Sequence, residues 1–273
     1  MSNDLSTTQP THLLMRLTHA CRSVLFYFFW VSFTILWIFP SLIASFLLPI
    51  KAKHFVIAVV YSQTVICAAR LLCGIKWNII GKEHLPKDNR GYLVFCKHQS
   101  TWETFFLATL LYPQVPVVKA ELSKLPIFGW MLTLINPIWI DRKKKTNALK
   151  QVVEQGKDRL QQGVSVMIFP EGTRVKPGLR KEFSKGAALL ATSAKAPAIA
   201  VAHNSGEYWS NTDWIKRPGV ITVVISSIIE TDELTTKELH SQVEDWINKK
   251  VDDISAIKFS GAFSQASDSG KRF

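Results

Sequence analysis

Residues 92–111, YLVFCKHQSTWETFFLATLL, join an apolar run to a polar turn and then to a second apolar run. The first five residues have the length and the β-branched or aromatic content of a buried strand, whereas residues 105–111 suit a helix. His98 is therefore expected in a turn between a strand and a helix. Turns that follow strands in α/β proteins often carry binding residues, so His98 is a candidate for a chemical role.

His98 and Glu103 are five residues apart, which on one continuous helix would point their side chains about 140° apart. They can meet only if His98 lies outside the helix. Ser100 followed by Glu103 fits a capping box, with Ser100 as N-cap and the helix beginning at Thr101. Two interpretations follow: Glu103 only closes the cap, or it accepts the Nδ1 proton of His98 and leaves Nε2 as a general base.

A second polar stretch, FPEGTR at residues 169–174, also follows an apolar run. Its composition is typical of a loop that holds an anion. Gly172 lets the backbone approach closely, Thr173 offers a hydroxyl group, and Arg174 presents a planar fork for a phosphate. Glu171 would accept a hydrogen bond from an acceptor hydroxyl or brace Arg174. Taken alone, the hexamer is more typical of a tight turn with a solvated arginine than of an anion-binding loop.

Short apolar runs alternate with amphipathic segments from about residue 77 onward, which predicts an α/β domain with a largely parallel or mixed sheet flanked by helices. Such sheets bind ligands at the carboxyl ends of their strands. His98, Lys119, Arg142 and Glu171 each follow an expected strand, so we expect them along one edge. The expected strands are residues 92–96, 115–119, 137–140, 164–169, 198–202 and 220–226.

The N-terminal part contains an uncharged run of twenty-seven residues, Val24–Ile50. A transmembrane helix needs about 20 apolar residues, and the run is too long for the core of a signal peptide. Pro40 interrupts it, and a second apolar stretch, Phe55–Leu72, contains only Arg70 as a charge. Two membrane crossings, or a helical hairpin in one leaflet with Arg70 at the headgroups, both fit, and a buried core helix is the remaining alternative. Basic residues flank the first run on both sides and give no orientation.

The formal net charge is +12, and 47% of the residues are hydrophobic. No zinc-finger or RNA-recognition motif accompanies the charge, so a nucleic-acid partner is not expected. An anionic membrane or a phosphorylated substrate explains the charge as well. The four cysteines form no CxxC pair and no metal-ligand cluster, which indicates reduced thiols and no metal site. They are Cys21, Cys67, Cys73 and Cys96.

The ordered motifs His-x4-Glu, Ile140-Asp141-Arg142 and FPEGTR resemble those of the glycerolipid acyltransferases, specifically the 1-acyl-sn-glycerol-3-phosphate acyltransferases, over roughly residues 76–230. The resemblance implies transfer of an acyl group from acyl-CoA or acyl-carrier protein to the sn-2 hydroxyl of 1-acyl-sn-glycerol-3-phosphate, giving phosphatidic acid for phospholipid biosynthesis. It implies no cofactor. It also implies a two-helix element seated in the inner membrane, with the active site on the cytoplasmic side.

The resemblance assigns His98 as the base and Glu103 as its partner. It places Arg142 in the second family motif and Lys119 where a basic residue binds phosphate, so that these two join residues 171–174 as substrate-binding residues. One departure concerns Glu103, because the usual family acid is aspartate. Glutamate keeps the charge and adds one methylene, so the orienting role survives where the backbone allows the longer reach.

The expected organisation is a membrane-embedded element at residues 1–75, a catalytic domain at 76–250 ending in an amphipathic helix at 234–247, and a flexible tail at 251–273. The expected partners are a lysophospholipid, the acyl donor and membrane lipids. Alternatives are an acyltransferase for another lysolipid and a non-catalytic membrane-associated lipid-binding protein. A serine hydrolase is disfavoured because the chain lacks a Gly-x-Ser-x-Gly motif.

Overall fold

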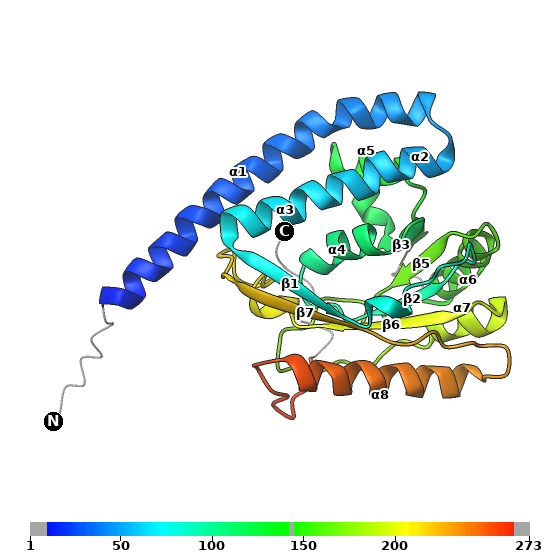
Figure 1. Cartoon of the computed structure of the whole chain (residues 1–273). Coiled ribbons are helices and arrows are strands. Elements are labelled where there is room, and N and C mark those ends of the chain that lie inside the picture. The colour runs from blue at the N-terminus through cyan, green and yellow to red at the C-terminus, as the bar shows by residue number, and fades with distance from the viewer. Residues whose placement is uncertain (1–9, 142–144, 265–273) are drawn as a thin grey trace.

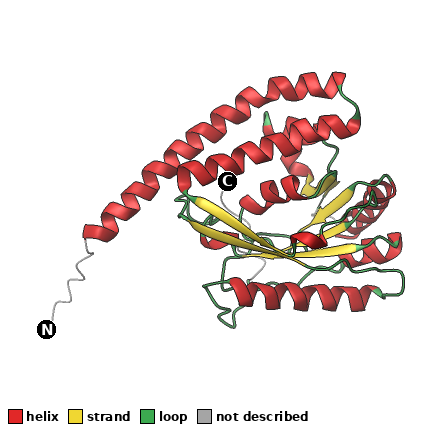
Figure 2. Ribbon diagram, in the orientation of Figure 1, coloured by secondary structure: helices red, strands yellow, loops and turns green. Residues whose placement is uncertain are grey.

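The computed structural model describes residues 10–141 and 145–264, and a seven-stranded sheet lies at its centre (Figures 1 and 2). The order across the sheet is β1-β7-β6-β2-β5-β3-β4. The strands are β1 (Ile75–Ile80), β2 (Leu93–Cys96), β3 (Gln114–Lys119), β4 (Ile138–Ile140), β5 (Ser165–Ile168), β6 (Ala198–His203) and β7 (Gly219–Ile225).

Five adjacent strands, β6, β2, β5, β3 and β4, run parallel to one another. β7 is antiparallel to β6, and β1 pairs parallel with β7, so the last two strands run in the opposite direction. The expected mixed α/β sheet is therefore confirmed, and its six expected strands are present within one or two residues at each end. Parallel neighbours need long crossover connections, which the helices supply.

β1 was not expected from the sequence. Its residues alternate between buried or half-buried and exposed positions, as on an edge strand that is covered on one face. It follows directly after a helix, and Gly74, with φ +72°, makes the turn between them. Only glycine adopts this left-handed conformation without strain, which is why the helix ends here and the strand begins one residue later.

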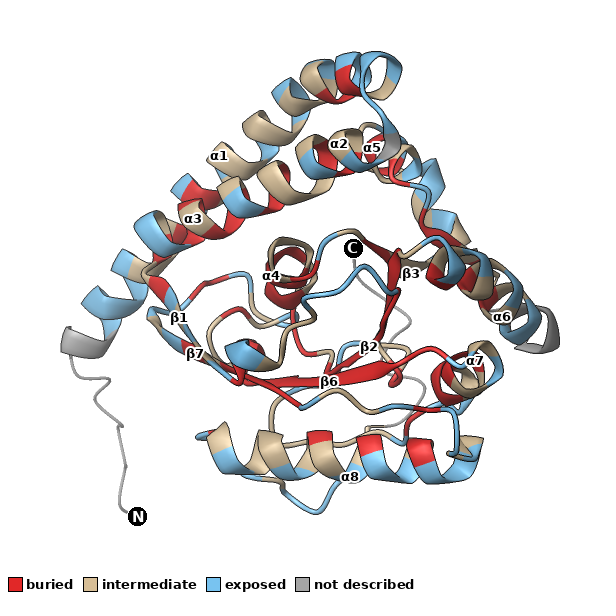
Figure 3. Ribbon diagram, turned by 45° about the vertical axis from the view of Figure 1, so that its right-hand side comes forward, coloured by how far each residue is buried: buried red, intermediate tan, exposed pale blue. Residues whose placement is uncertain are grey.

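Helices cover both faces of the sheet and form two apolar cores. Val94 and Cys96 of β2 face one core, whereas Leu93 and Phe95 face the other, as the two-residue period of a strand requires. Figure 3 shows burial concentrated on the strands and on the helix sides that face them. The first core lies under α1 (Pro10–Leu47), α3 (Tyr61–Cys73) and α4 (Trp102–Leu110), and the second under α6 (Lys145–Gln161), α7 (Gly186–Ala194) and α8 (Thr236–Ile254).

The two apolar stretches near the N-terminus form a helical hairpin. α1 continues through Pro40 without ending, and the chain returns through α2 and α3, which lie alongside α1 (Figure 1). Residues 13–47 and 51–73 are long and apolar enough to span a membrane, by length and composition alone. The remaining short helices are α2 (Ile50–His54), η1 (Phe55–Val60), η2 (Lys82–His84), η3 (Ala120–Lys124), α5 (Phe128–Leu134) and η4 (Ser205–Glu207).

The C-terminal part differs from the expected boundary at residue 251. α8 begins with a capping box between Thr235 and Glu238 and continues to Ile254. The segment after it forms backbone hydrogen bonds with the loop after β5: the Ser260 N–H donates to Gly178 and the Arg180 N–H donates to Ala262. Residues 255–264 therefore belong to the folded domain, and the rest of the expected tail lies outside the described residues.

Candidate active site

The carboxyl ends of β2 and β5 bring the two polar stretches together. The strands are in register, with Phe95 opposite Ile168, so the loops that follow begin at the same level. The His98 backbone N–H donates to Glu171 Oε2 at 2.8 Å, and the Val175 N–H donates to the His98 carbonyl at 2.8 Å. The FPEGTR loop and the residue after it thus hydrogen-bond both the N–H and the carbonyl group of His98.

His98 and Glu103 meet directly. His98 Nδ1 lies 2.9 Å from Glu103 Oε1, and Glu103 stands in the first turn of α4. The capping contacts exist as well, because the Ser100 N–H donates to Glu103 Oε1 at 2.8 Å and Ser100 Oγ accepts from the Trp102 N–H at 2.9 Å. One carboxylate therefore makes the contacts that both interpretations predict, but α4 begins at Trp102 with Thr101 as N-cap, one residue later than expected. The role of His98 as a base stays a prediction.

The environment of His98 favours the neutral imidazole. Burial lowers the pKa of His98, Glu103 opposes this effect, and Arg174 and His203 lower the pKa further. The ring stacks on Phe169, with centroids 3.8 Å apart and planes at 14°. Since a carboxylate only accepts, Nδ1 carries the proton and Nε2 keeps its lone pair. In the described part of the chain, no hydrogen bond uses Nε2, and about 15% of the side chain is exposed.

Glu103 is fully buried yet ionised. Its Oε1 accepts from His98 and from the backbone N–H groups of Gln99 and Ser100, and its Oε2 accepts from the hydroxyls of Ser100 and Ser205. Burial alone would raise the pKa of Glu103. The imidazoles of His203 and His98 and these hydrogen bonds outweigh burial, so the pKa lies well below its usual range. Glu103 remains an acceptor throughout the physiological pH range.

Lys97 and Glu171 form a buried ion pair between the two loops. Lys97 is 1% exposed and Glu171 2% exposed, and the Lys97 ammonium donates to Glu171 Oε1. The other oxygen of Glu171 accepts from the His98 N–H, so both oxygens are occupied. The expected roles for Glu171, an acceptor hydroxyl or Arg174, are not the contacts that the structure shows. Glu171 instead fixes the position of His98.

The other expected substrate-binding residues lie along the same edge. Gly172, with φ +69°, makes the turn and donates its N–H to the Phe169 carbonyl, and Thr173 is half-buried. Arg174 is exposed and has no ion-pair partner among the described residues. Lys119 is exposed at the end of β3, opposite Ile140 of β4. Arg142 lies outside the described residues.

The sequence interpretation missed three residues of this site: Lys97, His203 and Ser205. His203 is 1% exposed, accepts from the Ser205 N–H and donates to the Lys97 carbonyl at 2.8 Å. His203 comes directly after the strand expected at residues 198–202, and Ser205 lies two residues further along. The signal that singled out His98, a polar residue directly after a buried strand, would have found them too.

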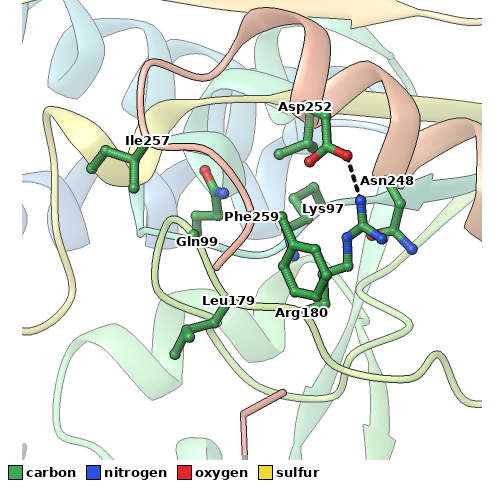
Figure 4. A pocket seen from close by; sticks show the side chains of 10 residues that line it. Lys97, Gln99, Leu179, Arg180, Asn248, Asp252, Ile257 and Phe259 are labelled. Carbon is green, nitrogen blue, oxygen red and sulfur yellow. Dashed lines mark hydrogen bonds and ion pairs between the residues drawn. The ribbon is translucent and has the colours of Figure 1, made fainter. Parts of the chain in front are cut away.

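A small cavity lies behind Lys97, under the C-terminal segment (Figure 4). Arg180 pairs with Asp252 there, and its guanidinium lies 4.1 Å from the ring centroid of Phe259. The cavity measures about 10 Å³, which is at most the room that one water molecule needs. It is therefore a feature of the packing between the loop and the C-terminal segment, and it is too small to hold a substrate.

Comparison with known proteins identifies the family of the chain. The acyltransferase family model matches residues 76–204. A 1-acyl-sn-glycerol-3-phosphate acyltransferase of Pseudomonas aeruginosa is 37% identical over 247 residues, which cover 89% of this chain and 95% of the relative. The chain belongs to the acyltransferase family. The resemblance seen in the motifs is confirmed, and this acyltransferase is an enzyme.

More distant relatives extend the match. A 1-acyl-sn-glycerol-3-phosphate acyltransferase of Saccharomyces cerevisiae is 27% identical, covering 82% of the chain and 75% of the relative. The crystal structure of the 1-acyl-sn-glycerophosphate acyltransferase PlsC from Thermotoga maritima superposes with a TM-score of 0.74 over 88% of this chain and 97% of that one, at 22% identity. The superposition shows that this chain and the Thermotoga maritima protein share one fold.

The Lys97–Glu171 pair predicts a large stability cost for breaking it. Glu171→Gln leaves a buried ammonium without a counter-charge, which should lower the free energy of unfolding by about 3–5 kcal/mol. Denaturant unfolding of the detergent-solubilised protein measures this. Glu182→Gln, an exposed carboxylate on the same loop, is the control and should change stability little. Equal stability of the two variants would show that the buried pair does not hold the loops.

Proposed function

We propose that the enzyme transfers a fatty acyl group from a thioester, acyl-CoA or acyl-carrier protein, to the sn-2 hydroxyl of 1-acyl-sn-glycerol-3-phosphate. The observation that carries the proposal is the His98–Glu103 contact of 2.9 Å with Nε2 left unbonded at the edge of the sheet. The names of the relatives from Pseudomonas and yeast support the acceptor. An acyltransferase for another lysolipid is the alternative, which the phosphate test below addresses.

The chemistry follows from the protonation state of the dyad. Nε2 of neutral His98 takes the proton of the acceptor hydroxyl, and the oxygen of that hydroxyl attacks the carbonyl carbon of the thioester. The carbon–sulfur bond then breaks, and the imidazolium returns its proton to the departing thiolate. Glu103 stays ionised and stabilises the imidazolium formed between these steps. An ester and a free thiol result, and the histidine is regenerated.

Arg174 is the proposed binding group for the acceptor phosphate. It is exposed, it lies in the loop that binds the His98 backbone, and its charge acts on His98 strongly enough to lower the pKa of the imidazole. A guanidinium holds two phosphate oxygens in a fixed geometry. Lys119, at the end of a strand two positions away from β2 in the sheet, would add positive charge at the same edge, and Arg142 is proposed from the family motif alone.

We further propose that the hairpin of α1 and α3 seats the enzyme in a membrane. Large apolar side chains lie exposed along α1. Their exposure to water is unfavourable by a free energy of about 25 cal/mol per Å² of apolar surface. Phe28, Phe39, Phe46 and Leu47 are between 63% and 85% exposed. Arg70 of α3 is exposed near Trp77, a pair suited to the headgroup region.

The contacts of the hairpin favour one leaflet over two crossings. At its base, Arg22 Nε donates to the Leu72 carbonyl, and Phe26 packs on Trp209 of the catalytic domain. At its tip, the Tyr112 hydroxyl donates to the Lys51 carbonyl. The catalytic domain thus contacts both ends of the hairpin. A polar domain cannot occupy both sides of a bilayer, so the hairpin lies flat along one surface.

The catalytic proposal predicts the effect of removing the imidazole. His98→Ala should lower kcat by roughly 10²- to 10⁴-fold, because general-base catalysis is lost. Thiol release from the acyl donor in the presence of lysophosphatidic acid measures turnover. His240→Ala on α8 removes a histidine from the opposite face of the sheet and should leave turnover unchanged. Near-normal kcat in a folded His98→Ala protein would exclude His98 as the base.

The phosphate assignment predicts a change specific to the acceptor. Arg174→Lys should lower kcat/KM for lysophosphatidic acid by about 10-fold, since the bidentate contact is lost, while background hydrolysis of the donor changes little. Lys176→Gln, an exposed cation two positions along, is the control. The kcat/KM for a lysolipid without the phosphate monoester should not change in Arg174→Lys. If Arg174→Lys lowered the rates of donor hydrolysis and of acceptor transfer equally, Arg174 would bind the donor or support the fold and would not bind the acceptor phosphate.

The membrane arrangement predicts which side of the bilayer the tip of the hairpin faces. Single cysteines in place of Lys53, near the tip, and of Lys250, on α8, should react with a membrane-impermeant maleimide from the same side, in a background with the native cysteines replaced by serine. Labelling of the two positions from opposite sides would establish a crossing.

The full chain should also remain in the membrane fraction after a high-salt wash.

A further inference from the structure

A closed ring of hydrogen bonds lies behind the imidazole of His98. His98 Nδ1 contacts Glu103 Oε1 at 2.9 Å, and Ser205 Oγ donates to Glu103 Oε2 at 2.9 Å. The Ser205 N–H donates to His203 Nδ1 at 3.3 Å, and His203 Nε2 donates to the Lys97 carbonyl at 2.8 Å. Lys97 is the residue before His98, so the ring returns to its starting point. It joins α4, the end of β6 and the turn after β2.

The directions of the two hydrogen bonds of His203 are fixed, and the Ser205 hydroxyl, which also lies 3.1 Å from Ser100 Oγ, has its shorter contact with Glu103 Oε2. A backbone N–H can only donate, so His203 Nδ1 accepts and the proton of this imidazole sits on Nε2. Burial lowers the pKa of His203, and this effect outweighs the opposing one from Glu103. The neutral side chain therefore connects Ser205 to the Lys97 carbonyl in one orientation. Its buried nitrogens are both satisfied, so there is no competing arrangement.

The ring uses both oxygens of a glutamate. Oε1 faces His98 and the backbone N–H groups of Gln99 and Ser100, while Oε2 accepts from the hydroxyls of Ser100 and Ser205. Aspartate, the usual family acid, is shorter by one carbon–carbon bond of about 1.5 Å. With α4 in place, we expect an aspartate at position 103 to lose either the imidazole or the Ser205 hydroxyl contact.

Ser205 has little freedom to point elsewhere. It is fully buried at the start of η4, and the next residue, Gly206, donates its N–H to the Gln99 side chain at 3.3 Å. A Cβ on Gly206 would lie 2.9 Å from Gln99 Cβ and from Pro177 Cγ, so the loops after β2, β5 and β6 are in contact here. The hydroxyl is thus held against Glu103 by three loops.

We propose that Ser205 is a positioning residue for the acyl transfer: it holds Oε2 of Glu103 so that Oε1 stays on His98, and it makes glutamate the fitting acid at position 103. His203 supports this by fixing the Ser205 backbone to the turn that carries His98. The inference rests on the His98–Glu103 dyad of the proposed function. It adds a residue that does not touch substrate and acts through Glu103.

Ser205→Ala tests the role by a pH profile. Without the Ser205 donor, Glu103 is more mobile and more basic, so kcat should fall by about 10-fold and the pKa of His98 should rise. Because the base must be neutral, the acid limb of kcat/KM should move to higher pH, and the loss should be greater at pH 6 than at pH 8. The charged or titratable groups that face His98 are Glu103, Arg174 and His203, and the substitution leaves all three in place.

A matched control separates this effect from a general loss of stability. Ser165 is also buried and accepts from the Tyr92 N–H, at the opposite edge of the sheet. Ser165→Ala should lower the melting temperature but leave the acid limb unchanged. Ser205→Cys keeps a weak donor on a somewhat larger side chain, so the acid limb of its kcat/KM profile should lie between those of the wild type and Ser205→Ala.

A double-mutant cycle decides whether Ser205 acts through the glutamate. Glu103→Asp should itself reduce kcat by about 10-fold, and adding Ser205→Ala to it should cost less than about 2-fold, because the shorter acid no longer reaches the hydroxyl. The same loss in both backgrounds, or an unmoved acid limb in Ser205→Ala, overturns the positioning role. Near-normal turnover in His98→Ala would instead overturn the proposed function itself, so the two failures are distinguishable.

Discussion

The parallel pairing of β2 with β5 on one side and β6 on the other is the constraint on which the site depends. Phe95 lies opposite both Ile168, where β5 ends, and Ala200, and β2 ends at the next residue, whereas β6 continues to His203 along the turn that carries His98. The loops that follow them therefore meet, although the side-chain hydrogen bonds from the loop after β2 to the other two loops span 73 to 107 residues of the chain. Closing such long connections costs entropy, which the apolar cores on both faces of the sheet must offset.

The site concentrates buried charge in a way that a stable core alone would not favour. Lys97, Glu171 and Glu103 are all less than 3% exposed. Removing such ions from water costs several kcal/mol each, and only complete hydrogen bonding makes the arrangement tolerable. Every oxygen of the two glutamates is bonded. The result is a rigid frame around one imidazole whose Nε2 makes no hydrogen bond among the described residues, which is the preorganisation that the proposed proton transfer requires.

Local patterns in the sequence predict the local parts of this frame. The spacing of His98, Ser100 and Glu103 predicts both the helix cap and the dyad, because these contacts span five residues or fewer. The pattern of buried strands predicts the sheet, except for the half-exposed edge strand β1. Pairing between distant loops has no such local signature. The contact of Lys97 with Glu171 depends on strand order, which periodicity does not give.

The strand order also explains why Glu171 was expected to contact substrate. In the sequence, a glutamate beside Gly172 and Arg174 is typical of an exposed anion-binding turn. In the structure β5 is the direct neighbour of β2, so Glu171 turns inward toward Lys97 and the His98 backbone, whereas Arg174, three residues later, reaches solvent. The direction of each side chain is decided by the neighbouring strand and not by the hexamer itself.

The N-terminal hairpin and the candidate active site share one aromatic cluster. Trp30 of α1 lies 5.5 Å from Phe105 of α4 and 5.7 Å from Trp209, measured between ring centroids. α4 carries Glu103, and Trp209 follows the loop that begins at Ser205. One face of the hairpin therefore supports the two elements that hold the acid in place, while its other face is exposed and apolar. A boundary at residue 75 separates these parts in sequence only, because the hairpin packs directly on α4 and on the segment after β6.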